Sequence, residues 1–474
     1  MGFKTYALED VLEITSSKRI KMADYVQSGI PFYRSKEIIE KSNNQPVSTD
    51  IFITCEHFEK IKMKFGAPEV GDILLTSVGT LGVSYQVSDD DLFYFKDGNL
   101  TWFRNFNDKV LSGYIYCWLK SPLARKKLNE ISIGTTQRAL TIASLKKIQI
   151  KIPSLDVQKK IVLIYESLSK KIINNSKINQ TLEQMAQALF KNWFVDFEPV
   201  KAKIAVLDSG GSQEKATLAA MTAISGKSAD ALAIFEREHP EQYAELKATA
   251  ELFPSAMQES KLGNIPDGWE MSTLAEKIKI IGGGTPKRSE SDYWGGDICW
   301  YSVKDAPRDG DVFVVDTVEK ITAKGLNNSS TKLLPVGTTI ISARGTVGKL
   351  ALVAVEMAMN QSCYGISGQD FSGPYLTYLR VKQCIDVLKR NTHGAVFDTI
   401  TTNTFETVNI LTAHKTINDK FEEIITPLFN SIKNNLVSNA YLSQLRDMLL
   451  PKLISGEIDL EDQTYILNIS TEGV

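Results

Sequence analysis

The stretch SARGTVG, at residues 342–348, is spaced like a loop whose backbone amides could hold a phosphate. A Walker-type phosphate loop ends in Gly-Lys followed by Ser or Thr, because that hydroxyl must reach a Mg²⁺ ion. Here Gly348-Lys349 is followed by Leu350, and Gly345 is only three residues upstream. The stretch therefore predicts a tight turn between two apolar runs and not a nucleotide site.

Other catalytic chemistry is equally hard to place in this chain. The five cysteines form no CxxC pair and the four histidines are scattered singly, so we expect reduced thiols and no metal site. An adenine-N6 methyltransferase should carry an Asn/Asp-Pro-Pro-aromatic tetrapeptide, and the nearest string, NNQP at 43–46, lacks the second proline and the aromatic residue. No acidic and lysine cluster of nuclease spacing stands out. We predict a chain without catalytic residues.

Composition and charge indicate a soluble protein of several domains. The chain has 474 residues, of which 43% are hydrophobic and 23% charged. No apolar run approaches the roughly 18 residues that span a bilayer, and the N-terminus lacks a signal peptide, so we expect a cytoplasmic protein with no membrane partner. Residues 1–153 and 261–415 carry net charges of +4 and +1, whereas 154–260 and 416–474 carry −2 and −5. This alternation favours polyanion contact by the first pair and protein contact by the second.

The chain repeats itself at long range. TSVGTLG at 76–82 matches SARGTVG at an offset of 266 residues, and IPFYRSKE at 30–37 matches ICWYSVKD at 298–305 at an offset of 268. IGTTQRALTIASLKKIQI at 133–150 matches HGAVFDTITTNTFETVNI at an offset of 260. Between these landmarks lie short β-branched runs bounded by Gly, Pro, Asn and Ser. We therefore predict an α+β protein with two similar mixed α/β domains, in which the repeated glycines make the same strand-joining turn twice.

A long helix is predicted after each domain. Apolar residues recur at 3-4 heptad spacing at Ile161, Ile164, Leu168, Ile178, Leu182, Met185 and Leu189, and again at Phe421, Ile424, Leu428, Leu442, Leu445 and Leu449. Asn175 and Asn435 interrupt the two seams at equivalent midpoints, where a buried Asn fixes register. We expect an antiparallel coiled coil in which these two residues meet. Two unrelated amphipathic core helices are the alternative.

An antiparallel pair would also set a distance. A coil of roughly 28 to 34 residues is about 42 to 51 Å long, and one turn of B-DNA is roughly 34 Å. Domains at opposite ends of such a coil could touch successive turns of one duplex.

The predicted organisation has six segments. Residues 199–262, rich in Ala, Gly, Ser, Glu and Lys and broken by SGGS and by Pro240, predict a connector of short helices. The other segments are a first domain, a central helix, a second domain, a C-terminal helix and a tail, at residues 1–153, 154–198, 263–415, 416–460 and 461–474.

Several longer strings resemble the specificity subunit of type I restriction-modification enzymes. They are INQTLEQMAQALFKNWFVDFEPVKAK (178–203), ESKLGNIPDGWE (259–270), GGGTPKRSESDYWGGDICW (282–300), ITAKGLNNSS (321–330), LPVGTTIISARGTVGKLAL (334–352), MNQSCYGI (359–366) and LLPKLISGEIDL (449–460). The resemblance covers nearly the whole chain and is strongest in the central helix and the second domain. The first domain departs from the family strings, apart from GTTQ and the glycine turn.

The resemblance implies a non-catalytic DNA-reading subunit. Each target-recognition domain would read one half of a bipartite, asymmetric double-stranded site, and the helices would dock two methyltransferase subunits for adenine-N6 methylation. Two restriction and translocation subunits would complete the complex. Cofactors would then be absent from this chain, and S-adenosylmethionine, ATP and Mg would be bound by the partners. A protein-binding coiled-coil scaffold without DNA readout and a single-chain restriction-methylation enzyme are the alternatives.

Base reading needs side chains that pair with base edges: Arg or Lys with guanine, Asn or Gln with adenine. The candidates lie in turns, at Lys18, Arg19, Lys21, Arg34, Lys36, Gln137 and Arg138 in the first domain, and at Lys287, Arg288, Lys304, Arg344, Asn360 and Gln361 in the second. Each is open to a second interpretation as a solvated charge or a turn residue. Tyr293, Trp294 and Trp300 could stack on a base, but we expect them in the core.

Overall fold

The computed structural model describes residues 2–134, 138–261, 263–369, 373–392, 399–458 and 460. The chain forms two compact units, one made of residues 1–173 and 439–474 and the other of residues 174–438. The division between the units cuts through both long helices, whereas the six segments drawn from the sequence keep helices and domains apart. Those segment limits stay a prediction.

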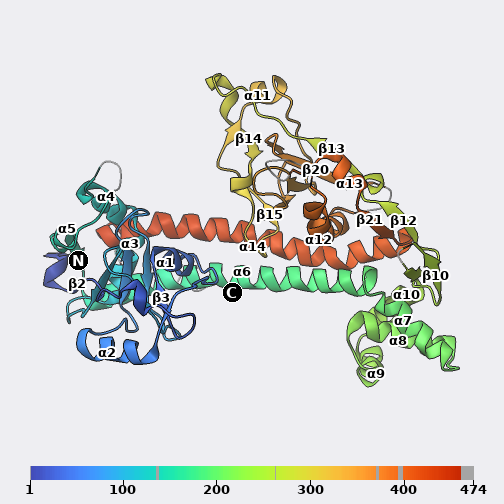
Figure 1. The fold of residues 1–474 in the computed structure, drawn as a ribbon, viewed down its shortest axis with the longest axis horizontal. Coiled ribbons are helices and arrows are strands. Elements are labelled where there is room, and N and C mark those ends of the chain that lie inside the picture. Colours follow the sequence, from blue (N-terminus) through green and yellow to red (C-terminus); the bar gives the residue numbers. More distant parts are fainter. Residues whose placement is uncertain are drawn as a thin grey trace. The chain divides into compact units, whose positions relative to one another are not determined.

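The first unit contains three small sheets packed with short helices (Figure 1). A four-stranded sheet has the order β2-β8-β5-β6, a three-stranded sheet the order β4-β3-β7, and β1 pairs with β9. The elements are β1 Lys4–Ala7, β2 Glu13–Thr15, β3 Ile30–Tyr33, α1 Ser35–Ser42, β4 Phe52–Ile53, α2 Cys55–Phe65, β5 Ile73–Thr76, β6 Ser84–Gln86, β7 Tyr94–Phe95, β8 Leu100–Arg104, α3 Ser112–Lys120, α4 Pro122–Ile131, α5 Ile142–Lys146 and β9 Gln149–Ile152.

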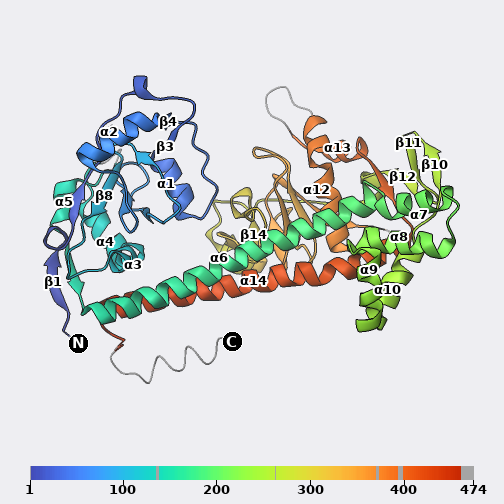
Figure 2. The same ribbon diagram turned by 90° about the horizontal axis from the view of Figure 1, so that it is seen from below.

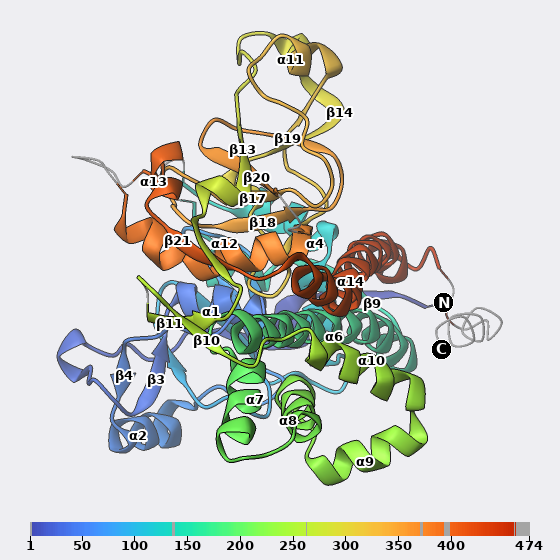
Figure 3. The ribbon, with the colours of Figure 1, turned by 90° about the vertical axis from the view of Figure 1, so that its right-hand side faces the viewer.

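The second unit repeats this plan. Figure 3 labels its strands β13, β14 and β17 to β21. Its five-stranded sheet has the order β13-β20-β17-β18-β15, its three-stranded sheet the order β16-β14-β19, and β12 pairs with β21. The elements are β12 Glu270–Thr273, β13 Ile278–Gly282, β14 Trp294–Tyr301, β15 Phe313–Val314, β16 Lys320–Ile321, α11 Ala323–Asn327, β17 Thr339–Ser342, β18 Leu350–Val353, β19 Met357–Met359, β20 Cys363–Gly368, α12 Pro374–Arg390, α13 Thr402–Glu406 and β21 Asn409–Thr412. Matching strand orders confirm the predicted pair of similar α/β domains.

The glycine turn has the same backbone in both units. The amide of Gly82 donates to the carbonyl of Thr76 at 2.9 Å, and the amide of Gly348 donates to that of Ser342 at 2.9 Å. The first and last glycines of both turns have φ between +75° and +83°, a left-handed region that favours glycine. The prediction of a structural turn is therefore correct. The residue before the first glycine, Val78 or Arg344, takes no part in these contacts and differs between the two domains.

The two long helices, α6 (Leu155–Phe194) and α14 (Lys415–Ser455), run antiparallel within each unit (Figure 2). In the first unit the guanidinium of Arg446 lies over the ring of Tyr165, and in the second Phe421 packs against Phe190 at 6.1 Å between ring centroids. The residue numbers of α14 therefore decrease as those of the contacting residues of α6 increase, as they do in an antiparallel pair. The helices have 40 and 41 residues, so they are longer than the 28 to 34 residues that the heptads predicted.

Asparagine pairing at the helix midpoint occurs one turn away from the predicted position. Asn435 donates a side-chain hydrogen bond to Asn179 at 2.8 Å. Asn175 is buried, as expected for a seam residue, and lies one helical turn before Asn179. Asn435 thus contacts Asn179, a residue that the sequence analysis did not name, and the meeting of Asn175 with Asn435 stays a prediction.

Three of the predicted seam residues are not in the seam. Ile178, Met185 and Leu445 are 49%, 48% and 42% exposed. Buried positions of the second unit include Ala186, Phe190, Ile425, Phe429 and Ile432 instead. The heptad pattern was ambiguous because each helix carries apolar residues on more than one face, and spacing alone does not say which face meets the partner.

The predicted connector is helical in the second unit. It contains α7 (Glu198–Asp208), α8 (Gln213–Ser225), α9 (Ala229–Glu238) and α10 (Pro240–Glu251), followed by the hairpin of β10 (Met257–Ser260) and β11 (Gly263–Pro266). Pro240 begins α10, where its missing amide is not needed. In the described part of the chain no single helix is long and apolar enough to cross a membrane; only the bent pair α8 and α9 meets that requirement jointly.

Candidate nucleic-acid interface

The second unit gathers several candidate side chains at one edge of its three-stranded sheet. β14 and β19 are parallel, with Tyr301 beside Met359, so both strands end at the same edge. The amide of Asn360 donates to the carbonyl of Tyr301 at 2.9 Å. The amide of Ala343 donates to the carbonyl of Ser362 at 2.7 Å, which brings the 342–348 turn to this edge.

The side chains presented there can donate to and accept from bases. Arg344 is exposed near the start of the 342–348 turn, and Gln361 is exposed beside it in the strand-end segment. Asn360 is half-buried, and its side-chain oxygen accepts the amide of Ser362 at 3.0 Å. Thr285 contacts Gln361 by a hydrogen bond and so joins the 283–288 loop to the edge. The structure thus brings together Arg344, Asn360 and Gln361.

The guanidinium of Arg288 is not free, because it contacts other residues of its own domain. It lies over the ring of Trp294 at 3.8 Å and forms an ion pair with Glu319, whose second oxygen is 3.0 Å away. Arg288 donates hydrogen bonds that hold the pKa of Glu319 below its usual range. The sequence interpretation of Arg288 as a free base contact is therefore unsupported, because its planar donors already face a carboxylate.

The neighbourhood of the Arg288–Glu319 ion pair also includes two lysines and two tryptophans. Lys287 is exposed and pairs with Glu290 at 3.2 Å, whereas Lys304 is exposed and lowers the pKa of Glu319 through its charge. Trp300 is buried, as expected, and its indole donates to the carbonyl of Gly284 at 3.0 Å. Trp294 is only half-buried, since one of its faces is covered by Arg288. Tyr293 is also half-buried.

The first unit builds the same edge with different side chains. The amide of Lys96 donates to the carbonyl of Tyr33 at 2.8 Å, as Asn360 does to Tyr301, and the amide of Ser77 donates to the carbonyl of Asn99 at 2.8 Å. Lys96 therefore occupies the place of Asn360, and Val78 the place of Arg344. Lys96 is exposed, and no sequence argument had selected it.

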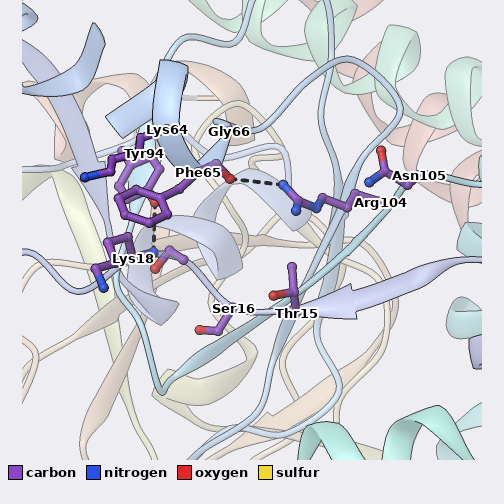
Figure 4. Close-up of a pocket in the computed structure, with 10 residues that line it drawn as sticks. Thr15, Ser16, Lys18, Lys64, Phe65, Gly66, Tyr94, Arg104 and Asn105 are labelled. Atoms are coloured by element: carbon purple, nitrogen blue, oxygen red, sulfur yellow. Dashed lines mark hydrogen bonds between the residues drawn. The ribbon is translucent and has the colours of Figure 1, made fainter. Parts of the chain in front are cut away.

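The first unit also has a polar hollow of about 620 Å³ (Figure 4). Its lining includes Lys18, Lys64, Phe65 and Arg104 (Figure 4). Phe65 is 42% exposed, with the ammonium of Lys18 5.0 Å and that of Lys64 5.8 Å from its ring centroid. The amide of Lys18 donates to the hydroxyl of Tyr94 at 2.8 Å. An exposed aromatic ring between two cations can contact a nucleotide by stacking and by charge.

Arg104 forms a wall of the hollow. Its guanidinium lies 4.4 Å from the ring of Trp102, donates to both oxygens of Glu13 at 3.0 Å, and donates to the carbonyl of Phe65 at 3.2 Å. These hydrogen bonds hold the pKa of Glu13 below its usual range. Sequence reasoning missed Lys64, Phe65 and Arg104, although the lysine-rich string KIKMKF at 60–65 was a usable signal.

Arg34 is tied into the first unit by carboxylates. It pairs with Glu37 at 2.7 Å and with Asp50 at 3.0 Å, and Glu37 is fully buried. The hydrogen bonds that the Arg34 guanidinium donates to Glu37 raise the pKa of Arg34. Lys36 is exposed and lies 3.8 Å from Glu40. Arg34 therefore has a structural role that its type and position in the sequence did not reveal.

Replacing Arg34 by Ala is expected to lower the free energy of unfolding by about 1–3 kcal/mol, because the buried carboxylate of Glu37 loses its partner. The double variant Arg34→Ala/Glu37→Gln should recover part of that loss. Thermal unfolding of both variants and of the exposed control Lys36→Ala measures this. If the Arg34→Ala protein had wild-type stability and an altered DNA target, Arg34 would be a DNA contact and not a structural residue.

The remaining candidates of the first unit are scattered. Arg19 and Lys21 are exposed on the segment that follows the hollow. Arg138 donates to the carbonyl of Asn129 at 2.9 Å and to the hydroxyl of Ser132 at 3.0 Å, so it caps the end of α4. Gln137 lies outside the described residues.

The chemistry available at these edges is hydrogen bonding, charge and stacking. Among the described residues, no group of three or more His, Cys, Asp or Glu side chains is placed to hold a metal ion. Two alike domains that present different donors and acceptors on one backbone frame define a recognition protein.

Comparison with known proteins gives the family. The model described as "Type I restriction modification DNA specificity domain" matches residues 1–184 and 266–439. The HindI specificity subunit of Haemophilus influenzae is 33% identical over 88% of this chain and 93% of its own length. The MjaIX specificity subunit of Methanocaldococcus jannaschii is 25% identical over 83% and 78%. A crystal structure of the S subunit from M. genitalium shares the fold, with a TM-score of 0.50, 12% identity and coverage of 95% and 96%.

The chain belongs to the specificity subunits of type I restriction-modification systems. Such a subunit is non-catalytic and carries the DNA recognition domains, and the enzymatic activities lie in other subunits. The resemblance noted in the sequence is thereby confirmed.

Proposed function

We propose that the two domains read the two halves of a bipartite, asymmetric double-stranded DNA site. The observation that supports this most directly is the shared edge. Equivalent backbone hydrogen bonds hold Ser77 and Lys96 in one domain and Ala343 and Asn360 in the other. Val78 and Arg344 follow Ser77 and Ala343 directly. A common frame gives both domains the same approach to a duplex. Different side chains at equivalent places give each half-site its own sequence.

The long helices would dock two methyltransferase subunits, which direct adenine-N6 methylation, and two restriction and translocation subunits would complete the complex. Support comes from apolar side chains that the fold leaves exposed. In the first unit Tyr441, Leu445 and Met448 lie on one face of α14, a set we call the α14 stripe. In the second unit Met185, the repeat equivalent of Leu445, is exposed on α6 together with Ile178. One such patch per helix provides one surface per methyltransferase.

The cofactors of the complex would be bound by the partners: S-adenosylmethionine by the methyltransferases, and ATP and Mg by the restriction subunits. The assembly would act in the cytoplasm, where chromosomal and invading DNA are both accessible.

A genome-wide map of methylated adenine tests this proposal. The chain is co-expressed with its methyltransferase in cells that lack adenine methylation, and modified bases are sequenced. A new motif with two specified halves and an unspecified spacer is the expected result. A methyltransferase that co-purifies without producing any motif would favour a scaffold without DNA readout and contradict the proposal.

Replacing Arg344 by Ala is expected to relax one guanine position in one half of that motif and leave the other half unchanged. A bidentate arginine to guanine contributes about 1–3 kcal/mol of discrimination, so methylation at the relaxed position should spread to other bases. The control is Lys215→Ala, which removes an exposed lysine of the connector and should preserve both halves of the motif. Relaxation in both halves, or in neither, would contradict the assignment of Arg344.

A further inference from the structure

A second cavity lies next to the 342–348 turn in the second unit. Its volume is about 280 Å³, and it is bounded by the 307–312 loop, the end of the turn, α12 and α6. Four cations and two carboxylates line it, at Arg308, Lys349, Lys382, Lys389, Glu183 and Asp309. The cavity therefore carries an excess of positive charge.

Of the four cations, Lys382 is committed to an ion pair, whereas Arg308, Lys349 and Lys389 have none among the described residues. Lys382 forms an ion pair with Glu183, which is buried and also accepts the hydroxyl of Tyr378 at 3.0 Å. Lys349 and Lys389 are exposed and have neither an ion pair nor a side-chain hydrogen bond among the described residues. Unpaired ammonium groups around one concave site attract an anion more strongly than the same groups spread over a surface.

The absence of a side chain at Gly348 leaves room for Lys389 at the end of the turn. A Cβ atom built on Gly348 would come within 2.5 Å of Cε and 3.3 Å of Nζ of Lys389, so the lysine side chain lies directly across the glycine. The equivalent glycine of the first unit, Gly82, faces an apolar carbon of Leu128 at 3.3 Å. The cationic site is thus specific to the second domain, although the turn is shared.

We propose that this cavity binds a phosphate group of the DNA backbone and so positions the duplex for Arg344, which lies four residues before Gly348 in the same turn. This inference rests on the proposed DNA readout. Phosphate contacts fix the position of a protein on a duplex without selecting bases. The cavity therefore contributes affinity for the duplex, and the turn contributes selectivity for its base sequence.

The test uses the complex with the methyltransferase and measures duplex affinity by fluorescence anisotropy over a range of KCl concentrations. The double variant Lys349→Ala/Lys389→Ala should weaken specific and non-specific binding by a similar factor. It should also reduce the slope of log affinity against log salt by about 1, with an unchanged methylated motif. The charge-preserving Lys349→Arg/Lys389→Arg protein should retain the slope, and so should the control Lys215→Ala/Lys247→Ala, which removes two exposed lysines of the connector.

Three results would overturn the inference. An unchanged slope in the alanine variant would show that no backbone phosphate is bound there. An altered motif would make the lysines base contacts. Stabilisation of the wild type, but not of the variant, by inorganic phosphate, together with an unchanged slope, would identify a free anion as the ligand. If the wild-type complex itself binds no duplex, the proposed function fails as well, and this outcome is distinct from a failure of the cavity alone.

Discussion

Replacement of Leu445 and Met448 by Glu is expected to release one of the two methyltransferase subunits, halving the amount that co-purifies, and to lower adenine methylation in cells. Both residues are exposed on the α14 stripe, where they would be buried against a partner. Two carboxylates in a desolvated interface would lose their hydration without gaining partners, at a cost of several kcal/mol. Affinity-tag pull-down and sequencing of methylated adenine measure the two effects.

The matched control is Asp447→Asn, an exposed change one residue before Met448 and therefore about 100° around the helix. It should retain both binding and methylation. Because Leu445 and Met448 are exposed, the double variant should also unfold at the wild-type temperature. Normal co-purification of a folded Leu445→Glu/Met448→Glu protein would move the docking surface away from the α14 stripe.

Replacement of Trp193 by Ala should lower the free energy of unfolding of the second unit by about 3–5 kcal/mol. Trp193 is fully buried, and its ring packs edge-to-face on Phe253 at 4.9 Å and against Phe421 at 5.3 Å. It therefore joins α6, the end of the connector and α14. We expect amide hydrogen exchange to accelerate in α7 through α10 and along the paired segments of the long helices.

Trp193→Phe is the matched control. It keeps an aromatic ring in the same contacts and removes an indole N–H that has no hydrogen-bond partner among the described residues. Its loss of stability should therefore be much smaller than that of the alanine variant. Equal effects of the two substitutions would show that the indole nitrogen, and not aromatic packing, stabilises this core.

The repeat was predictable because turns place strict demands on sequence. Glycines at Gly79, Gly82, Gly345 and Gly348 all have positive φ, and such positions keep their residue type while neighbours diverge. The long helices were predictable because apolar spacing continues over many turns. Their burial was not, since Met185 and Leu445 follow the heptads yet face outward.

The candidate site was only partly predictable. Arg344 and Gln361 are exposed at the reading edge, as their turn positions suggested. Whether a cation is free depends on the partners that the fold supplies: Arg288 pairs with Glu319, and Arg34 pairs with the buried Glu37 and with Asp50. The hollow of the first unit joins residues from strands and helices about 90 positions apart, which no local pattern reveals.

The hydrogen bonds that hold the glycine turn have an evolutionary consequence. They involve backbone groups and the hydroxyl at the first position, Thr76 or Ser342, and none needs the side chain at position 78 or 344. A mutation of that codon can therefore alter the interaction with DNA while leaving the fold intact. A specificity subunit with this turn could therefore acquire a new DNA target by single substitutions, one half-site at a time, and every variant along the way would still fold.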